Sequence, residues 1–212
     1  MDNNKAKTVR TVVILAAAIL IVDQIVKFLV KTNMYIGEDI PIFNWFHIHF
    51  IENEGFAFGL AFGGAIGKVV LTLVRMAASA LIVWIIVRQI QKGGRRSLIY
   101  SLTLIVAGAV GNLIDSCFYG LIFSSSYPTP AVLFPVGGGY GQFLQGRVVD
   151  MFYFPLFEFD WPQWMPLIGG RHFEFFNAIF NTADASITIG VIWLLIDQLF
   201  LSTDKKKEEA TE

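Results

Sequence analysis

Long apolar runs alternate with shorter polar connections along the whole chain. Four runs contain few charged side chains and lie at residues 11–30, 65–90, 97–119 and 177–201. A helix rises about 1.5 Å per residue, so about twenty residues cross a hydrocarbon core of about 30 Å. The pattern therefore predicts an α-helical integral membrane protein with four transmembrane helices and with both chain ends on one side of the membrane.

Lysine and arginine residues gather at the two chain ends and between the second and third runs. They are Lys5, Lys7, Arg10, Arg88, Lys92, Arg95, Arg96, Lys205, Lys206 and Lys207. Membrane proteins carry an excess of such residues in their cytoplasmic segments. Both termini are therefore expected in the cytoplasm, and the connections at residues 31–64 and 120–176 are expected on the outer side.

The outer connections differ in composition from the apolar runs. Residues 40–53 are rich in β-branched and aromatic side chains, which favour strands. We therefore expect a small extracytoplasmic β-rich platform at residues 36–63, with an aromatic belt at the membrane interface as the alternative. Residues 121–145 are rich in Ser, Pro and Gly, which predicts a mobile inserted loop. The expected organisation is one membrane domain at residues 1–204 and a charged cytoplasmic tail at residues 205–212.

Composition supports the membrane assignment and excludes other classes of protein. The 212 residues are 55% apolar and 16% charged, whereas about 25% of residues are charged in soluble domains. The net charge is -1 and the sequence has no basic stripe, so it does not predict a nucleic-acid-binding protein. One cysteine and three histidines without a ligand-like spacing predict neither a disulfide nor a zinc site, so we expect no metal and no organic cofactor.

Aspartate residues interrupt the apolar pattern and are the first candidates for chemistry. Asp23, Asp115 and Asp184 lie inside the spans, where a charged side chain is costly and is a functional candidate by default. Asp150 lies in the second outer connection, three residues after Arg147. The predicted orientation places all four carboxyl groups toward the outer leaflet.

Helical spacing indicates which polar side chains share a face. Asn177, Asn181 and Asp184, at i, i+4 and i+7, are expected on one face of the fourth helix. Asn112 and Asp115, at i and i+3, are expected on one face of the third helix. That second face either binds another helix through hydrogen bonds or serves the chemistry.

Two basic residues inside the spans are expected to have structural partners. Lys27 lies one helical turn after Asp23, and we favour an ion pair between them over a chemical role. Arg75 stands alone near the middle of the second span, and we expect a structural partner for it, such as a buried carbonyl group.

Asp150 and Asp184 differ from the other carboxyl groups because one lies in a non-helical segment and the other in a helix. Two carboxyl groups brought together at a partly hydrated depth of the membrane do not both ionise at neutral pH, so they share a proton. One then takes a proton from water while the other polarises a peptide carbonyl, as in aspartyl peptide hydrolysis. A small ion or proton transporter and a non-catalytic membrane scaffold are the alternatives. A transporter predicts polar residues through the full membrane depth, whereas the inner halves of these spans are largely apolar.

Five sequence blocks follow one another across nearly the whole chain. They are DQIVK at residues 23–27, NEGFAFG at residues 53–59, GAVGNLID at residues 108–115, GRVVD at residues 146–150 and FNTADASITIG at residues 180–190. In their order and their positions relative to the spans, they resemble the blocks of the lipoprotein signal peptidase family, signal peptidase II. One block alone would be weak evidence, whereas five in order make the resemblance specific.

The resemblance implies an intramembrane aspartyl endopeptidase of the bacterial cytoplasmic (inner) membrane. Such an enzyme removes the signal peptide from diacylglyceryl-modified prolipoproteins and cuts before the lipidated cysteine. The family's catalytic dyad carries over to Asp150 and Asp184, with the active site at the outer leaflet. Residues expected to bind substrate or to support the dyad are Asp23, Lys27, Asn53, Gly55, Asn112, Asp115, Arg147, Asn181 and Ala183. The implied partners are lipidated prolipoproteins, membrane lipids and the cyclic-peptide inhibitors of the family, and the chain is expected to act as a monomer.

The sequence departs from the family pattern in two places. Ser116 stands where the family usually has an arginine directly after the GNxxD block. We expect Arg147 to replace that arginine in steadying the substrate backbone or the dyad. The connection between the GNxxD and VVD blocks, which contains residues 121–145, is also longer than is typical of the family.

Overall fold

The structure is a computed structural model that describes residues 3–54 and 64–209. In this part of the chain, four helices are long and apolar enough to cross a membrane. The spans are Asn3–Asn33, Ile66–Lys92, Arg96–Ile122 and Thr182–Leu199. The predicted class, a four-span helical membrane protein, is confirmed.

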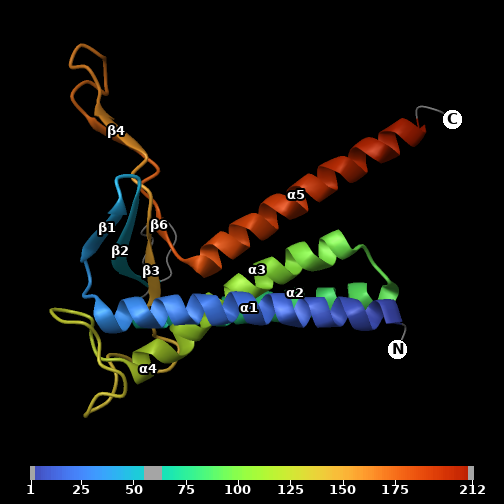
Figure 1. The fold of residues 1–212 in the computed structure, drawn as a ribbon, viewed down its shortest axis with the longest axis horizontal. Helices are drawn as coiled ribbons and strands as arrows, with labels where there is room; N and C mark the ends of the chain where they lie inside the picture. The colour runs from blue at the N-terminus through green and yellow to red at the C-terminus, as the bar shows by residue number, and fades with distance from the viewer. Residues whose placement is uncertain (1–2, 55–63, 210–212) are drawn as a thin grey trace.

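The helices form a bundle that is open at one end. They are α1 (Asn3–Asn33), α2 (Gly64–Lys92), α3 (Arg96–Ile114), the π-helix η2 (Asp115–Tyr119), α4 (Gly120–Ile122) and α5 (Thr182–Glu209). Helices α1 and α2 lie almost parallel, whereas α3 and α5 are inclined to them (Figure 1). The chain leaves α1 and enters α5 at the same end of the bundle, and the strands lie there (Figure 1).

Small residues allow α3 and α5 to approach closely. A Cβ atom at Gly108 would lie 2.8 Å from Cγ1 of Ile187 and would also meet the carbonyl oxygen of Ala183. A Cβ atom at Gly190 would lie 2.8 Å from the carbonyl oxygen of Ser101. Such close backbone approach is typical of helix pairs in membranes, where packing rather than hydrophobic burial drives association. The contact fixes the first turns of α5 against α3.

The fourth span begins at Thr182 and not at Asn177 as predicted. Ile179 and Phe180 instead form a short strand that pairs with Tyr153 and Phe152. Asn177 is exposed in the loop before this strand and does not share a helix face with Asp184. The apolar pattern could not show this boundary, because the residues before Thr182 are as hydrophobic as those of the helix.

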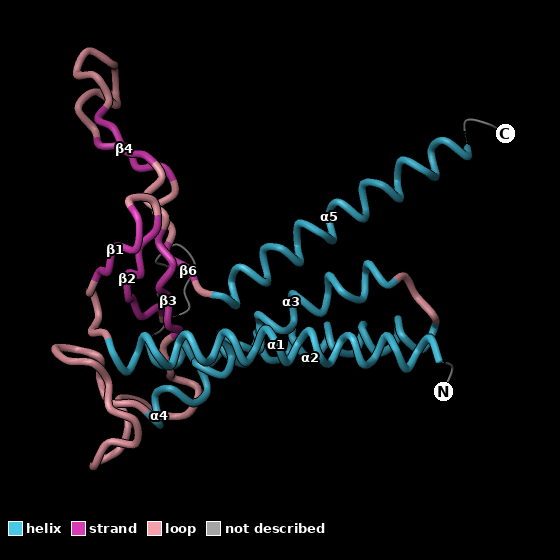
Figure 2. The backbone as a smooth tube through the Cα atoms, in the orientation of Figure 1, coloured by secondary structure: helices cyan, strands magenta, loops and turns pink. Residues whose placement is uncertain are grey.

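A four-stranded antiparallel sheet lies where α1 ends and α5 begins (Figure 2). In order, its strands are β1 (Asp39–Phe43), β2 (Phe46–Asn53), β3 (Val148–Tyr153) and β6 (Ile179–Phe180). The two outer connections therefore build one sheet. The strands predicted at residues 40–53 are confirmed, and the part of the platform at residues 55–63 lies outside the described residues.

A separate two-stranded ribbon, which the sequence analysis did not predict, projects from the sheet (Figure 2). Its strands are β4 (Phe157–Asp160) and β5 (His172–Phe175). Phe157 stacks on Phe175 with 4.5 Å between the ring centroids. Alternation of Phe with polar residues in both segments is the period-two signal that could have revealed the ribbon.

Part of the insertion at residues 121–145 belongs to the apolar core beside the four-stranded sheet. Phe123 and Ala131 are buried in one apolar cluster with Phe50 of β2 and Val149 of β3. Ser126 is also fully buried. These residues pack as a core does, so the expectation of a mobile loop is wrong at these positions.

Candidate active site

The pleat of β3 places Asp150 beside the start of α5. Val149 and Met151, on either side of it, belong to the apolar core, so alternation turns Asp150 toward the opposite face of the strand. Strand β2 fixes the register, with Ile51 opposite Asp150. The Asp150 side chain is buried, and its hydrogen bond to Asn181 shows that it faces the N-terminus of α5.

Asn181 connects the two predicted dyad residues. Its Nδ2 atom donates a hydrogen bond of 2.6 Å to Oδ1 of Asp150. Its Oδ1 atom accepts a 2.9 Å hydrogen bond from the backbone N–H of Asp184, and its own backbone N–H donates to Oδ2 of Asp184 over 3.4 Å. This reciprocal pair is a capping box. It sets the N-terminus of α5 at Thr182 and fixes the Asp184 side chain. The cap of α5 and the dyad are thus one structure.

Asn112 of α3 holds Asp184 from the other side. Its Nδ2 atom donates to Oδ1 of Asp184 over 2.8 Å. Its Oδ1 atom accepts hydrogen bonds from Lys27 Nζ (2.8 Å) and Asn181 Nδ2 (3.2 Å). Both Asp184 oxygens therefore accept N–H groups at the N-terminus of a helix, and these contacts fix the orientation of the carboxyl group.

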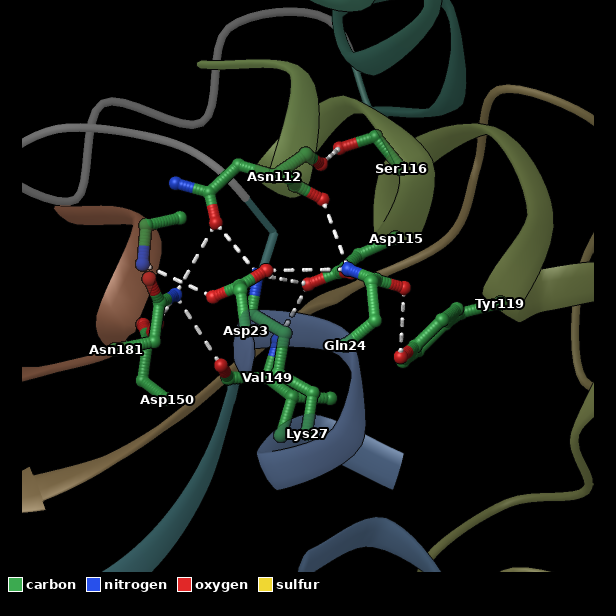
Figure 3. A network of polar contacts seen from close by, with 12 residues as sticks. Asp23, Gln24, Lys27, Asn112, Asp115, Ser116, Tyr119, Val149, Asp150 and Asn181 are labelled. Carbon is green, nitrogen blue, oxygen red and sulfur yellow. Dashed lines mark hydrogen bonds and ion pairs between the residues drawn. The ribbon is translucent and has the colours of Figure 1, made fainter. Parts of the chain in front are cut away.

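Behind Asn112, Lys27 lies between two carboxylates. Its Nζ atom is 3.0 Å from Oδ2 of Asp23 and 2.7 Å from Oδ2 of Asp115, and all three side chains are fully buried (Figure 3). Asp23 also accepts the backbone N–H of Ala183 (2.9 Å), and Asp115 accepts that of Val149 (3.3 Å). The predicted ion pair of Asp23 with Lys27 is confirmed. The triad binds α1, η2, β3 and α5 together around the dyad.

Gln24 is a part of this network that the sequence analysis did not single out. Its Nε2 atom donates to Asp23 (3.1 Å) and to Asp115 (3.0 Å), and its Oε1 atom accepts the hydroxyl of Tyr119 (3.2 Å) (Figure 3). A Cβ atom at Gly111 would lie 2.7 Å from Oδ2 of Asp23, so the third helix needs glycine there. A polar amide inside an apolar span was the signal that could have identified Gln24.

The environment of Asp150 favours its protonated form. Burial, and then the negative charge of Asp184, raise the pKa of Asp150 to about 7. Hydrogen bonds from Asn53 and Asn181 and the charge of Lys27 act in the opposite direction and are weaker. A carboxyl group with this pKa holds a proton in about half of the molecules at neutral pH, and in those molecules the dyad carries one proton.

Of the other residues predicted to support the dyad, Asn53 contacts it and Arg147 does not. Asn53, at the end of β2, donates a hydrogen bond to Asp150. Gly55 lies outside the described residues. The Arg147 guanidinium group contacts Glu52 (3.3 Å) and Glu54 (3.4 Å), and among the described residues it contacts neither dyad carboxyl. The expected contact of Arg147 with the dyad is therefore wrong, while its contact with the substrate backbone stays a prediction.

A second buried ion pair, also not predicted, anchors the insertion to α1. Lys31 Nζ contacts Glu52 and donates to Ser126 Oγ over 2.9 Å, and Ser126 donates to Glu52 over 2.8 Å. Burial alone would raise the pKa of Glu52, but the adjacent charge of Lys31 and the hydrogen bonds to this carboxylate lower it below its usual value. Glu52 is thus held ionised on β2, the strand that pairs with the Asp150 strand β3.

A cavity of about 260 Å³ opens beside Asp184, between α2, α3 and α5. Its walls are formed by Arg75, Ala78, Ser79, Ile82, Ala109, Asn112, Asp184 and Ile187. The dyad therefore borders a space at the level of the membrane spans, and Arg75 lines this space. Nothing in the sequence pattern places Arg75 near the dyad.

Histidine and acidic side chains also meet on the sheet. His47 and His49 both contact Asp39, at 2.9 and 3.2 Å. Within residues 3–54 and 64–209, no group of three or more His, Cys, Asp or Glu side chains is arranged to hold a metal ion.

Comparison with known proteins adds to this geometry. The family model described as signal peptidase (SPase) II matches residues 15–200. The chain belongs to the signal peptidase II family. A lipoprotein signal peptidase of Porphyromonas gingivalis is 46% identical over 188 residues, which are 88% of this chain and 82% of that protein. One of Amoebophilus asiaticus is 33% identical over 205 residues, which are 93% of this chain and 82% of that protein.

A solved structure of a bacterial membrane enzyme shares the fold of this signal peptidase II family member. Its TM-score is 0.57 at 26% identity, and the match covers 89% of this chain and 92% of the other. Family membership makes the chain a peptidase with membrane-spanning helices. It favours this function over the ion or proton transporter that the clustered carboxyl groups alone had left open.

Proposed function

We propose that the protein is an aspartyl endopeptidase that removes signal peptides from diacylglyceryl-modified prolipoproteins, cutting before the lipidated cysteine. The observation that carries the proposal is the link made by Asn181, which joins Asp150 and Asp184 in one hydrogen-bonded unit. Relatives named lipoprotein signal peptidase support the choice of substrate. The remaining expected residues, Asp23, Lys27, Asn112 and Asp115, support the dyad as a buried frame.

In the proposed mechanism, the two carboxyl groups have different roles. The Asp184 carboxylate accepts a proton from a water molecule, and the water oxygen attacks the scissile carbonyl carbon. Asp150 donates its proton to the carbonyl oxygen, which gives a tetrahedral diol. Asp184 then protonates the departing amide nitrogen, the C–N bond breaks, and Asp150 regains its proton from the diol hydroxyl. The products are a signal peptide with a free carboxylate and a lipoprotein with a free amino group.

The substrate's lipid explains why such a dyad belongs at the outer leaflet. A diacylglyceryl group buries its acyl chains in the membrane and so holds the adjacent peptide bond at the lipid-water boundary. Hydrolysis consumes water, which is scarce deeper in the hydrocarbon. Asp150 on an extramembrane strand and Asp184 in the first turn of a span fit that depth. The proposed cycle needs no metal and no organic cofactor.

The test is cleavage of a diacylglyceryl-modified prolipoprotein by the purified full chain in detergent. Asp150→Asn and Asp184→Asn are expected to lower kcat at least about 10²–10⁴-fold, because each removes one general acid-base step. Asp197→Asn is the matched control, since Asp197 lies at the other end of the span Thr182–Leu199 and pairs with Arg95. The unlipidated precursor is expected to be cut poorly.

Folding of each variant is checked by gel filtration and circular dichroism. Full activity in a folded Asp150→Asn or Asp184→Asn variant would refute the dyad. A folded parent that cuts no lipidated precursor would refute the substrate.

A further inference from the structure

The cavity beside the dyad has a polar wall on α2. Arg75 and Ser79, one helical turn apart, line it together with Asn112 and Asp184. Ser79 is 6% exposed, and its Oγ atom has no hydrogen-bond partner among the described residues. Helix α2 therefore presents polar side chains to Asp184 at a depth where its other faces carry apolar side chains.

The charges around Asp184 explain what a cation in this wall does. Among the described residues, the charged groups around the first turn of α5 are Asp23 and Lys27 of α1, Arg75 of α2, Asp115 of η2 and Asp150 of β3. Lys27 contacts two carboxylates, so the triad carries one more negative than positive charge. A dyad with one proton adds a further negative charge. Arg75 supplies the positive charge that offsets it.

Arg75 is well suited to act on Asp184 across the cavity. Its side chain is half-buried, and Asp184 is the charged group that acts on it. A guanidinium group stays charged in nearly any environment, and it gives up its hydration more readily than an ammonium group does. Ser116, next to Asp115, is buried and donates to the carbonyl oxygen of Asn112, so that position brings no charge to the dyad.

We propose that Arg75 is a positioning residue that holds Asp184 in its carboxylate form and thereby keeps the shared proton on Asp150. This inference rests on the dyad of the proposed function and deepens it. Arg75 contributes to turnover by fixing which carboxyl group acts as the base. Loss of its positive charge removes the electrostatic preference for the proton on Asp150, so the acidic limb of the pH-activity profile moves to higher pH.

The test compares kcat and KM across the active pH range for the purified parent, Arg75→Gln, Arg75→Lys and Arg88→Gln, with the lipidated precursor. In Arg75→Gln, we expect the midpoint of the acidic limb to shift to higher pH by about one unit, because a nearby opposite charge has been removed. We expect kcat to fall more than KM rises. Arg75→Lys keeps the charge and is expected to keep the parent's acidic limb. Arg88→Gln removes a positive charge from the inner end of α2, where Arg88 stacks on Trp84, and is expected to behave like the parent.

Several outcomes overturn the inference. An unchanged acidic limb in Arg75→Gln would do so, as would a change confined to KM, which indicates substrate binding. A Lys variant that matches the Gln variant would show that charge is not what matters. Arg75→Met, which keeps the apolar stem, replaces the Gln variant if that variant does not fold. If Asp184→Asn is inactive while Arg75→Gln matches the parent, only the Arg75 inference fails; if Asp184→Asn is active, the dyad fails and the role of Arg75 fails with it.

Discussion

At the scale of single residues, one lysine holds the buried polar frame of the site. Lys27 is fully enclosed and reaches Asp23, Asp115 and Asn112 at 2.7–3.0 Å. A buried ion pair adds little when both partners are replaced by apolar groups, but removal of one partner leaves an uncompensated charge. The network is therefore most sensitive to changes that affect one charge only.

Lys27→Met is accordingly expected to lower the free energy of unfolding by about 3–5 kcal/mol, the range measured when one partner of a buried pair is lost. Two carboxylates, Asp23 and Asp115, would remain close together without a cation between them. Thermal unfolding of the purified protein in detergent measures the effect. Lys7→Met, at an exposed position on the same helix, is the matched control. Equal stability of the two variants would show that the triad is not a structural frame.

At the scale of elements, sequence patterns predicted existence better than boundaries. Apolar length alone predicts a helix that can span a bilayer, and the strands at residues 40–53 followed from their β-branched and aromatic side chains. The start of α5 was missed because Asn181 and Asp184 fix it through two specific hydrogen bonds. Hydrophobicity does not record such a cap. The same cap joins the two dyad residues. The geometry of the site therefore depends on contacts between segments far apart in the sequence, which a local pattern does not show.

Gly108→Ala tests whether the contact of α3 with α5 positions the dyad. The added Cβ atom would meet backbone atoms of Ala183, which directly precedes Asp184. Overpacking of this kind costs about 1–3 kcal/mol, and the displaced first turn of α5 is expected to lower kcat. Thermal unfolding and the cleavage assay measure the two effects. In Gly141→Ala, the nearest atoms lie at 3.6–3.8 Å, an ordinary contact, so parent-like behaviour is expected there. A Gly108→Ala variant that also behaves like the parent would show that the contact of α3 with α5 can accommodate a methyl group and does not position the dyad.

At the scale of the whole molecule, the site exists only where separate parts of the chain meet. The frame comes from α1, α3 and η2, the two carboxyl groups come from β3 and α5, and the cavity beside them is completed by α2. The sequence indicated the carboxyl pair because Asp150 lies in a non-helical segment and Asp184 in a helix, and because both fall in blocks that resemble those of the family. It could not indicate Arg75, because nothing in the pattern of α2 states which face of that helix turns toward α5.

The orientation of this assembly can be tested with single cysteines in a Cys117→Ser background. Val136→Cys lies at a fully exposed position in the insertion at residues 121–145, and Lys92→Cys lies at the exposed last residue of α2, next to the turn that leads to α3. The basic residues around that turn are expected to hold it in the cytoplasm. A membrane-impermeant maleimide should therefore label Val136→Cys in intact spheroplasts and label Lys92→Cys only after lysis.

The result bears directly on the proposed substrate. The sheet and the insertion lie at the same end of the bundle as the dyad, so labelling of Val136→Cys from outside would also locate the dyad on the outer side (Figure 1). A lipidated precursor presents its cleavage site at the surface to which it has been exported, and only a dyad on that side can reach it. The reverse labelling pattern would leave the family membership intact and would refute the outer-leaflet site. The Cys117→Ser parent should remain unlabelled in both conditions, because the remaining chain contains no cysteine.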